Sequence, residues 1–219
     1  MLSMEPAPQS SFGRRRLPAT LSGCRYAAAN LAVSLVFVVG ALPSALHYGT
    51  RFADFIFAGG AIAMSIFALL RSPPSASSFS LGAVCAFLGM ALMPALLNTS
   101  LPRAGAAYSL AAALELLGVG LSMAGRIWMG RAFGILPANR GIVSDGPFGW
   151  MRHPVYAGWL ILMAGYAMSY HDPRNALIAA AAVPFAIWRI SLEEGLLSRD
   201  PHYQRYRERV PFRLLPGLY

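Results

Sequence analysis

Polar residues that could carry chemistry are concentrated in one stretch, Gly146–Gly158, which reads GPFGWMRHPVYAG. Arg152 is a permanent cation whose forked N–H groups can hold a carboxylate, and His153 can donate or accept a hydrogen bond near neutral pH. Pro154 fits the first turn of a helix, where free backbone N–H groups favour an anion. The stretch therefore indicates a site for a charged ligand at the start of a helix.

Tyr156 and Gly158 follow in the first helical turn of this stretch. Tyr156 offers a ring and a hydroxyl group, and Gly158 leaves room for a ligand to approach the backbone. A purely structural interpretation stands beside this one. In it, Arg152 and His153 are anchors at the membrane interface and Gly158 is a helix-packing position.

A second group of charged residues is the pair Glu193 and Glu194, near the end of a long apolar run. Acidic side chains at a membrane boundary are costly unless they are paired or solvated, and they are functional candidates by default. Adjacent residues of a helix diverge by about 100°, so one carboxylate can face a ligand while the other meets water. The alternative is a solvated helix end with an ion pair between Arg189 and Glu193.

Glu115 lies in the middle of another apolar run, close to Gly118 and Gly120. A buried acid needs a partner, such as a serine hydroxyl or an arginine from another span, and the two glycines allow a backbone or a ligand to come close. Helix packing explains the two glycines equally well.

The composition excludes an ordinary soluble domain, because 56% of the 219 residues are hydrophobic and 12% are charged, against about a quarter charged in soluble domains. All 18 basic residues are arginines, placed in the gaps between apolar runs, which is typical of a membrane rim and not of a nucleic-acid-binding face. Cys24 and Cys85 show no metal-ligand spacing, so neither a disulfide nor a metal site is predicted. The apolar run after Arg14–Arg16 is too long for a signal-peptide core.

We therefore predict an all-α, polytopic integral membrane protein with about six transmembrane helices. The apolar runs behind this prediction are Tyr26–Tyr48, Phe52–Leu70, Phe79–Leu97, Ala106–Met129, Pro154–Tyr170 and Asn175–Ile190. The last two form a helical hairpin, and the basic segment Pro201–Val210 forms a short amphipathic helix on the cytoplasmic surface. The chain divides into a disordered basic tail (1–25), three N-terminal helices (26–105) and a catalytic half (106–219).

The arginines also predict the orientation. The tail, the turn at 71–78, the segment 126–152 and the region from Arg189 onward hold 15 of them, and the opposite side holds three. Positive residues accumulate on the cytoplasmic side, so both termini are expected in the cytoplasm and the number of spans is even. We expect an integral protein of the bacterial inner membrane.

Taken together, these clusters resemble the isoprenylcysteine carboxyl methyltransferase family, which is itself similar to the membrane phospholipid N-methyltransferases. The resemblance covers the C-terminal part of the chain and none of the first three spans. The matching elements are Gly146-Pro147-Phe148, Arg152–Gly158, Glu193-Glu194, Tyr203, Tyr206, Arg209-Val210-Pro211 and Leu215-Pro216.

The resemblance implies methyl transfer from S-adenosylmethionine, which would enter from the cytoplasm while a lipophilic substrate arrives from the bilayer. It implies that Glu193 or Glu194 receives the cofactor's ammonium group and that Arg152 holds its carboxylate. Further cofactor contacts implied by the resemblance are His153, Pro154, Tyr156, Gly158, Gly118 and Gly120, with Tyr203 and Tyr206 covering the adenine.

The substrate determines which catalytic groups are needed. A carboxylate or thiolate would be held by an arginine, for which Arg209 and Arg213 are candidates, whereas an amine would need a base such as Glu115 or one of the paired glutamates. A small or lipid substrate is favoured over a prenylated protein, because the sequence has no evident region for docking a protein. Two other classes stay open: an NADPH-dependent membrane sterol-type reductase, and a non-catalytic transport or accessory protein.

Overall fold

The computed structural model describes residues 19–46, 52–70, 76–77, 81–100, 104–130, 138–139, 142–217 and 219. The described residues are almost entirely helical, which confirms the predicted all-α class apart from one antiparallel pairing of two-residue strands. The elements are α1 (Ala19–Leu46), α2 (Phe52–Leu70), β1 (Ala76–Ser77), α3 (Leu81–Leu92), η1 (Met93–Leu96), α4 (Gly105–Met129), β2 (Ala138–Asn139), η3 (Gly146–Gly149), α5 (Pro154–Met168), α6 (Pro173–Leu197) and α7 (Pro201–Arg209).

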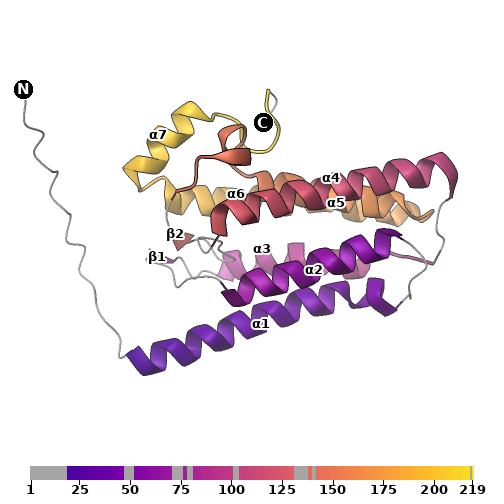
Figure 1. Cartoon of the computed structure of the whole chain (residues 1–219), viewed down its shortest axis with the longest axis horizontal. Coiled ribbons are helices and arrows are strands. Elements are labelled where there is room, and N and C mark those ends of the chain that lie inside the picture. Colours follow the sequence, from indigo (N-terminus) through magenta and orange to yellow (C-terminus); the bar gives the residue numbers. More distant parts are fainter. Residues whose placement is uncertain are drawn as a thin grey trace, which may run out of the picture.

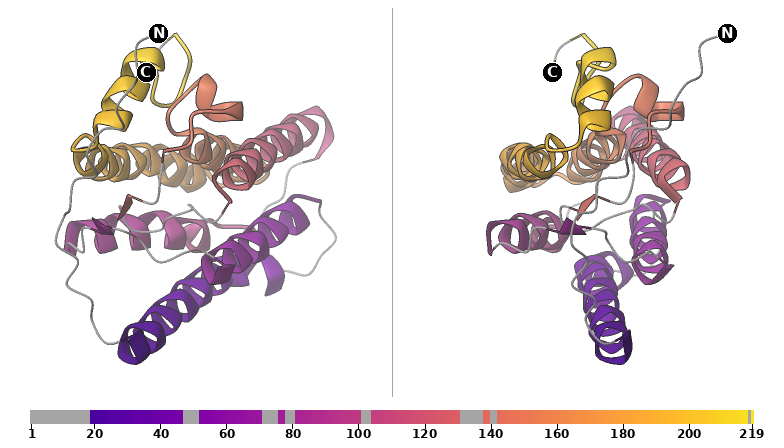
Figure 2. Two further views of the ribbon diagram at one scale, coloured as in Figure 1. Left: turned by 60° about the vertical axis from the view of Figure 1, so that its left-hand side comes forward. Right: turned by 90° about the vertical axis from the view of Figure 1, so that its left-hand side faces the viewer.

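The long helices pack in layers (Figures 1 and 2). Helices α4, α5 and α6 form one layer. Helices α2 and α3 form the N-terminal layer against it, and α1 packs on the outer side of α2 and α3. Helix α7 and the C-terminal segment sit on the α4–α6 layer at one end of the bundle (Figure 1). Arg152, His153, Glu193 and Glu194 are gathered at this end, whereas Glu115 is not.

The helix starts and stops follow local sequence rules. Helices α6 and α7 each begin with a proline in the first turn, preceded by an aspartate whose carboxylate accepts a backbone N–H: Asp172 from Arg174 and Asp200 from His202, both at 2.8 Å. The predicted hairpin of α5 and α6 is present. At the far end of α4, Gly130 adopts a positive φ of 50°, a conformation that favours glycine.

Several helix boundaries differ from the predicted ones, and two of the differences are informative. Helix α1 begins at Ala19, so residues 19–25 are helical and do not belong to the predicted disordered tail, whose remainder lies outside the described residues. The third predicted span, Phe79–Leu97, is an α-helix from Leu81 to Leu92 and then a 3₁₀ turn. Pro94 explains this ending, because proline has no N–H to continue the α-helical ladder.

Helices α4 and α5 make the closest helix pair of the catalytic half. A Cβ atom added at Gly158 would lie 2.6 Å from the Gly118 carbonyl oxygen and from Ser122, and one added at Gly165 would lie 2.8 Å from the Ala111 carbonyl oxygen. Small residues at such a crossing let two helix backbones touch, as is common between membrane helices. This contact fixes the register of α5, whose first residue follows His153.

At the other end of the bundle, an amide network joins η1 to the α5–α6 hairpin. The fully buried Asn175 accepts the Asn98 N–H at 2.9 Å and donates to the Asn98 carbonyl oxygen at 2.9 Å, while the Asn98 amide donates to Asp172 at 2.6 Å. The hairpin turn is therefore held to the N-terminal layer by paired polar groups.

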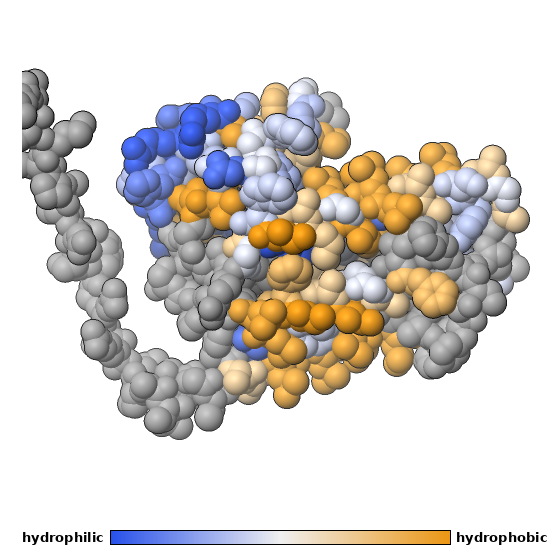
Figure 3. All heavy atoms as spheres, in the orientation of Figure 1, coloured by the Kyte–Doolittle hydropathy of each residue, from blue (hydrophilic) through white to orange (hydrophobic). Residues whose placement is uncertain are grey.

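The surface supports a membrane location. Within the described residues, α4 and α6 are long and apolar enough to cross a bilayer, and four further apolar helical stretches are shorter. Large apolar side chains are exposed along several helices, including Leu31 (65%), Phe55 (64%) and Leu177 (73%). Apolar side chains cover much of the visible face, whereas hydrophilic ones gather at the end that carries α7 (Figure 3). The number of spans, six, stays a prediction.

Candidate functional site

The candidate site lies where the start of α5 and the end of α6 meet the C-terminal segment. The backbone N–H groups of Arg152 and His153 donate to the carbonyl oxygens of Phe212 and Arg213, both at 2.9 Å. These two hydrogen bonds hold residues 212–213 against the entry to α5. Residues far apart in the chain are thereby brought to one place.

Glu194 is the centre of this site and is 5% exposed. One carboxylate oxygen accepts from Arg152 Nε at 2.8 Å and from the Tyr203 hydroxyl at 3.2 Å, and lies 3.1 Å from His153 Nε2. The other oxygen accepts from Arg213 Nε and Nη2, both at 2.9 Å. Five polar atoms therefore surround a carboxylate that offers about four lone-pair directions, so its acceptor capacity is saturated.

Arg152, which is 6% exposed, also fastens the C-terminal segment. Besides Glu194, its guanidinium donates to the carbonyl oxygens of Val210 at 2.8 Å and Pro211 at 2.7 Å. Three of its five N–H groups are thus directed to the protein itself. The resemblance assigned Arg152 to the cofactor carboxylate, and that role stays a prediction beside the contacts seen here.

Glu193 has a separate set of neighbours and is only partly buried. The Tyr156 hydroxyl donates to a Glu193 oxygen at 2.8 Å, and Arg189 Nε donates to the same hydroxyl at 3.2 Å. Arg189 also donates to the carbonyl oxygen of Ala83 in α3 at 3.3 Å. The ion pair anticipated between Arg189 and Glu193 is therefore replaced by a bridge through Tyr156, which leaves acceptor capacity on Glu193.

The tyrosines of α7 pack against the site. Tyr203 and Tyr206 are each 3% exposed, their ring centroids lie 5.9 Å apart, and the Tyr206 hydroxyl donates to the Phe148 carbonyl oxygen at 2.8 Å. Burial raises the pKa of both phenols, and the Glu194 carboxylate adds to the rise at Tyr203. Both tyrosines therefore stay protonated donors, and their predicted contact with adenine stays a prediction.

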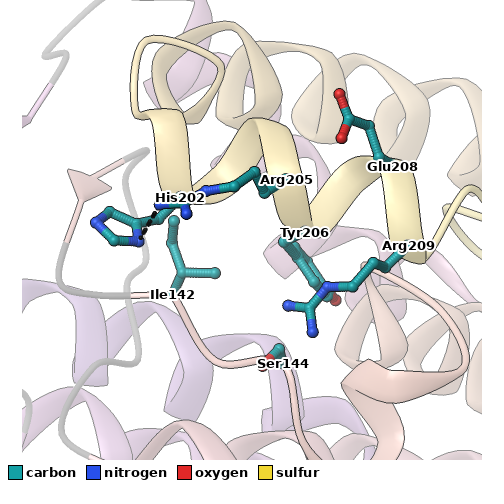
Figure 4. Close-up of a pocket in the computed structure, with 7 residues that line it drawn as sticks. All are labelled: Ile142, Ser144, His202, Arg205, Tyr206, Glu208 and Arg209. Atoms are coloured by element: carbon teal, nitrogen blue, oxygen red, sulfur yellow. Dashed lines mark hydrogen bonds between the residues drawn. The ribbon is translucent and has the colours of Figure 1, made fainter. Parts of the chain in front are cut away.

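The two arginines predicted to hold an acidic substrate lie in different places. Arg213 reaches Glu194, whereas Arg209 lies on the outer face of α7 and lines a groove with Ser144 and Tyr206 (Figure 4). The structure thus brings Arg213 into the site and leaves Arg209 beside it.

Glu115 lies away from the cluster. It is fully buried in α4 and accepts the Ser169 hydroxyl at 2.7 Å, which supplies one of the two partner types predicted for it. Ser169 follows the last residue of α5, which is 15 residues long and so spans about 22 Å from its start beside His153. The structure does not bring Glu115 together with the Glu193–Glu194 end.

The three glycines predicted to contact the cofactor have different surroundings. Gly118 and Gly158 face each other across the α4–α5 contact, and their contacts are with the neighbouring helix. Gly120 is exposed on another face of α4, with nothing within 4 Å of an added Cβ. Their predicted cofactor contacts stay predictions, and helix packing accounts for the first two.

Several functional contacts were missed by sequence reasoning. The carbonyl oxygens of Ala83, Val210 and Pro211 accept from buried arginines, and no side-chain pattern reveals which carbonyls will do so. Within the described part of the chain, no group of three or more His, Cys, Asp or Glu residues could hold a metal ion.

Comparison with known families identifies the region that contains most of this site. The family model described as "Isoprenylcysteine carboxyl methyltransferase (ICMT) family" matches residues 106–199, which include Arg152, His153, Glu193 and Glu194. Residues 106–199 are therefore similar to this family. No curated protein matches the chain at a significant level.

The match supports a methyltransferase, and together with the apolar helices it supports a membrane location. The resemblance on which the sequence analysis relied is thereby confirmed. The ICMT match ends before α7, so Tyr203, Tyr206 and Arg213 are assigned to the site by the geometry alone.

Proposed function

We propose that this ICMT-family protein transfers the methyl group of S-adenosylmethionine to a small lipophilic or lipid substrate at the cytoplasmic face of the membrane. The observation that carries the proposal is the convergence of Arg152, His153, Tyr156, Glu193 and Glu194 at one end of α5 and α6. All five lie within the region matched by the family, next to helices with an apolar exterior.

The chemistry of the side chains fits this cofactor. Its amino-acid part carries an ammonium and a carboxylate, and the site offers carboxylates and guanidinium groups for them. Glu194 is already saturated by five polar atoms, so Glu193, whose observed partner is the Tyr156 hydroxyl, is the better acceptor for the ammonium. We therefore assign the ammonium contact to Glu193 and a supporting role to Glu194.

The protein's task is then mainly one of placement. S-adenosylmethionine, when bound, supplies both the electrophilic methyl group and the leaving thioether. The chain's residues hold the cofactor in line with the nucleophile and exclude water. Arg213, whose side chain is 31% exposed, is the candidate for binding the acidic group of a substrate. Glu193 is the candidate base for removing a proton from an amine substrate.

Cofactor binding is the direct test. Purified protein in detergent should bind S-adenosylhomocysteine in a calorimetric titration and should give no heat with NADPH. Binding of NADPH without binding of S-adenosylhomocysteine would contradict the methyltransferase proposal and favour a sterol-type reductase. Glu193→Gln should weaken the binding of S-adenosylhomocysteine by about tenfold or more, because it removes a charge-assisted hydrogen bond.

A matched control is Glu208→Gln, which removes one carboxylate from exposed α7 and should leave that affinity unchanged. Equal affinities in wild type and Glu193→Gln would move the ammonium contact elsewhere. Cells with and without the protein, fed methionine carrying an isotopically labelled methyl group, then name the substrate through the labelled lipid or metabolite.

A further inference from the structure

A groove runs between α7 and the segment that precedes η3. Its volume is about 580 Å³. Residues of α7 form one wall and residues 142–144 form the other (Figure 4). The lining residues are Ile142, Ser144, His202, Arg205, Tyr206, Glu208 and Arg209.

The groove is positively charged. Arg205 and Arg209 are four residues apart on α7, so they lie on the same face of the helix. Arg205 Nη2 lies 3.1 Å from His202 Nδ1, and the Arg209 side chain extends toward Ser144 (Figure 4). Glu208 also borders the groove, but its side chain points away (Figure 4). The groove therefore presents two guanidinium groups and a hydroxyl.

The walls restrict what kind of anion fits. Ile142 supplies apolar surface, whereas Tyr206 borders the groove but is only 3% exposed, with its hydroxyl bonded to the Phe148 carbonyl oxygen. Guanidinium groups bind phosphate oxygens in bidentate fashion. Helix α7, which forms one wall of the groove, lies at the hydrophilic end of the molecule, next to apolar surface (Figures 1 and 3). A phosphate attached to an apolar body matches the guanidinium groups, the apolar side chain of Ile142 and the position of α7 next to apolar surface.

We propose that this groove binds the phosphodiester of an anionic membrane phospholipid, with Arg205 and Arg209 contacting the phosphate oxygens. The site is separate from methyl transfer and does not depend on the proposed function. A lipid bound there holds α7 against residues 142–144. It thereby keeps Tyr203, on the buried face of the same helix, in contact with Glu194.

Soluble short-chain lipids test the proposal on the full-length protein in an uncharged detergent. Calorimetric titration compares dihexanoyl phosphatidylglycerol, dihexanoyl glycerol and inorganic phosphate. The phosphatidylglycerol should bind at least about tenfold more tightly than either fragment, because each fragment lacks one half of the recognised chemistry.

Charge-matched variants locate the contact. Arg205→Gln with Arg209→Gln should weaken phosphatidylglycerol binding by about 30-fold, since each arginine near an anionic lipid contributes about fivefold. Arg199→Gln with Arg207→Gln removes the same charge from exposed positions outside the groove, and should change affinity by less than about threefold because exposed charges are screened. If the groove double variant does not fold, each of its single variants should lose about fivefold.

Three results would overturn the proposal. Equal losses in the two double variants would mean that the lipid responds to the overall charge of α7. Inorganic phosphate binding as tightly as phosphatidylglycerol would make the groove a site for free anions. If phosphatidylglycerol gives no heat of binding, the groove does not bind this lipid and the proposal is wrong.

Discussion

Glu194 and Glu115 are both glutamates in the family-matched region and both are buried, yet their surroundings are opposite. Glu194 is held by two arginines, a histidine and a tyrosine at the polar end of the bundle. Glu115 lies inside the α4–α5 contact, where its observed hydrogen bond comes from the Ser169 hydroxyl. The first environment stabilises a carboxylate anion, whereas a hydroxyl partner in an apolar setting does not require a charge.

The difference between the two glutamates shows that charged and uncharged contacts lie in different parts of the fold. Cations and carboxylates are paired at the end that faces the C-terminal segment, and small residues together with hydroxyl contacts build the α4–α5 contact. We assign the proposed binding of a charged cofactor to the first region. Alignment of the helices that carry the first region belongs to the second.

The largest expected effect comes from neutralising the first glutamate. Glu194→Gln keeps the shape but replaces one acceptor oxygen with an N–H₂ group that faces guanidinium donors. Arg152 and Arg213 then lose their counter-charge, and we expect a loss of about 3 kcal/mol in the free energy of unfolding. Thermal unfolding in detergent measures it.

Glu193→Gln is the control for that change, because it alters the same helical turn and leaves the five contacts of Glu194 in place. It should lower cofactor affinity while changing stability by less than about 1 kcal/mol. Similar melting temperatures for wild type and Glu194→Gln would show that the buried cluster does not hold the C-terminal segment.

A smaller effect is expected from the α4–α5 contact itself. Gly158→Ala places a methyl group 2.6 Å from the Gly118 carbonyl oxygen and from Ser122, so the helices must separate. Overpacking of this kind costs about 2 kcal/mol. Gly120→Ala, whose added methyl meets nothing within 4 Å, should be neutral or slightly stabilising, by up to about 1 kcal/mol.

The same unfolding assay distinguishes the two alanine variants. A destabilised Gly158→Ala that still binds S-adenosylhomocysteine normally would confirm a packing role. Loss of binding without loss of stability would instead support the contact with the cofactor that the resemblance implied for Gly158.

Much of this arrangement could be predicted from the sequence. Long apolar runs indicate helices of membrane length, and proline residues indicate where helices begin or end. Phe52–Leu70 was predicted to the residue, and the Arg152–Pro154 helix start and the Glu193–Glu194 helix end were recognised. What could not be predicted was the pairing between segments. Which of two adjacent carboxylates is saturated depends on how Arg213 and Tyr203 return across the end of α6, and sequence spacing does not encode that return.

The smallest effect is expected at the second glutamate. Glu115→Gln keeps an oxygen that can accept the Ser169 hydroxyl and adds no charge, so we expect a stability change below about 1 kcal/mol. Because its partner lies at the far end of α5, the affinity for S-adenosylhomocysteine should be unchanged. Once the substrate is known, the methylation rate decides the matter. A rate within about twofold of wild type keeps Glu115 a structural residue, whereas a loss of about a hundredfold would make it the base predicted for an amine substrate, and would break the contrast between the two glutamates.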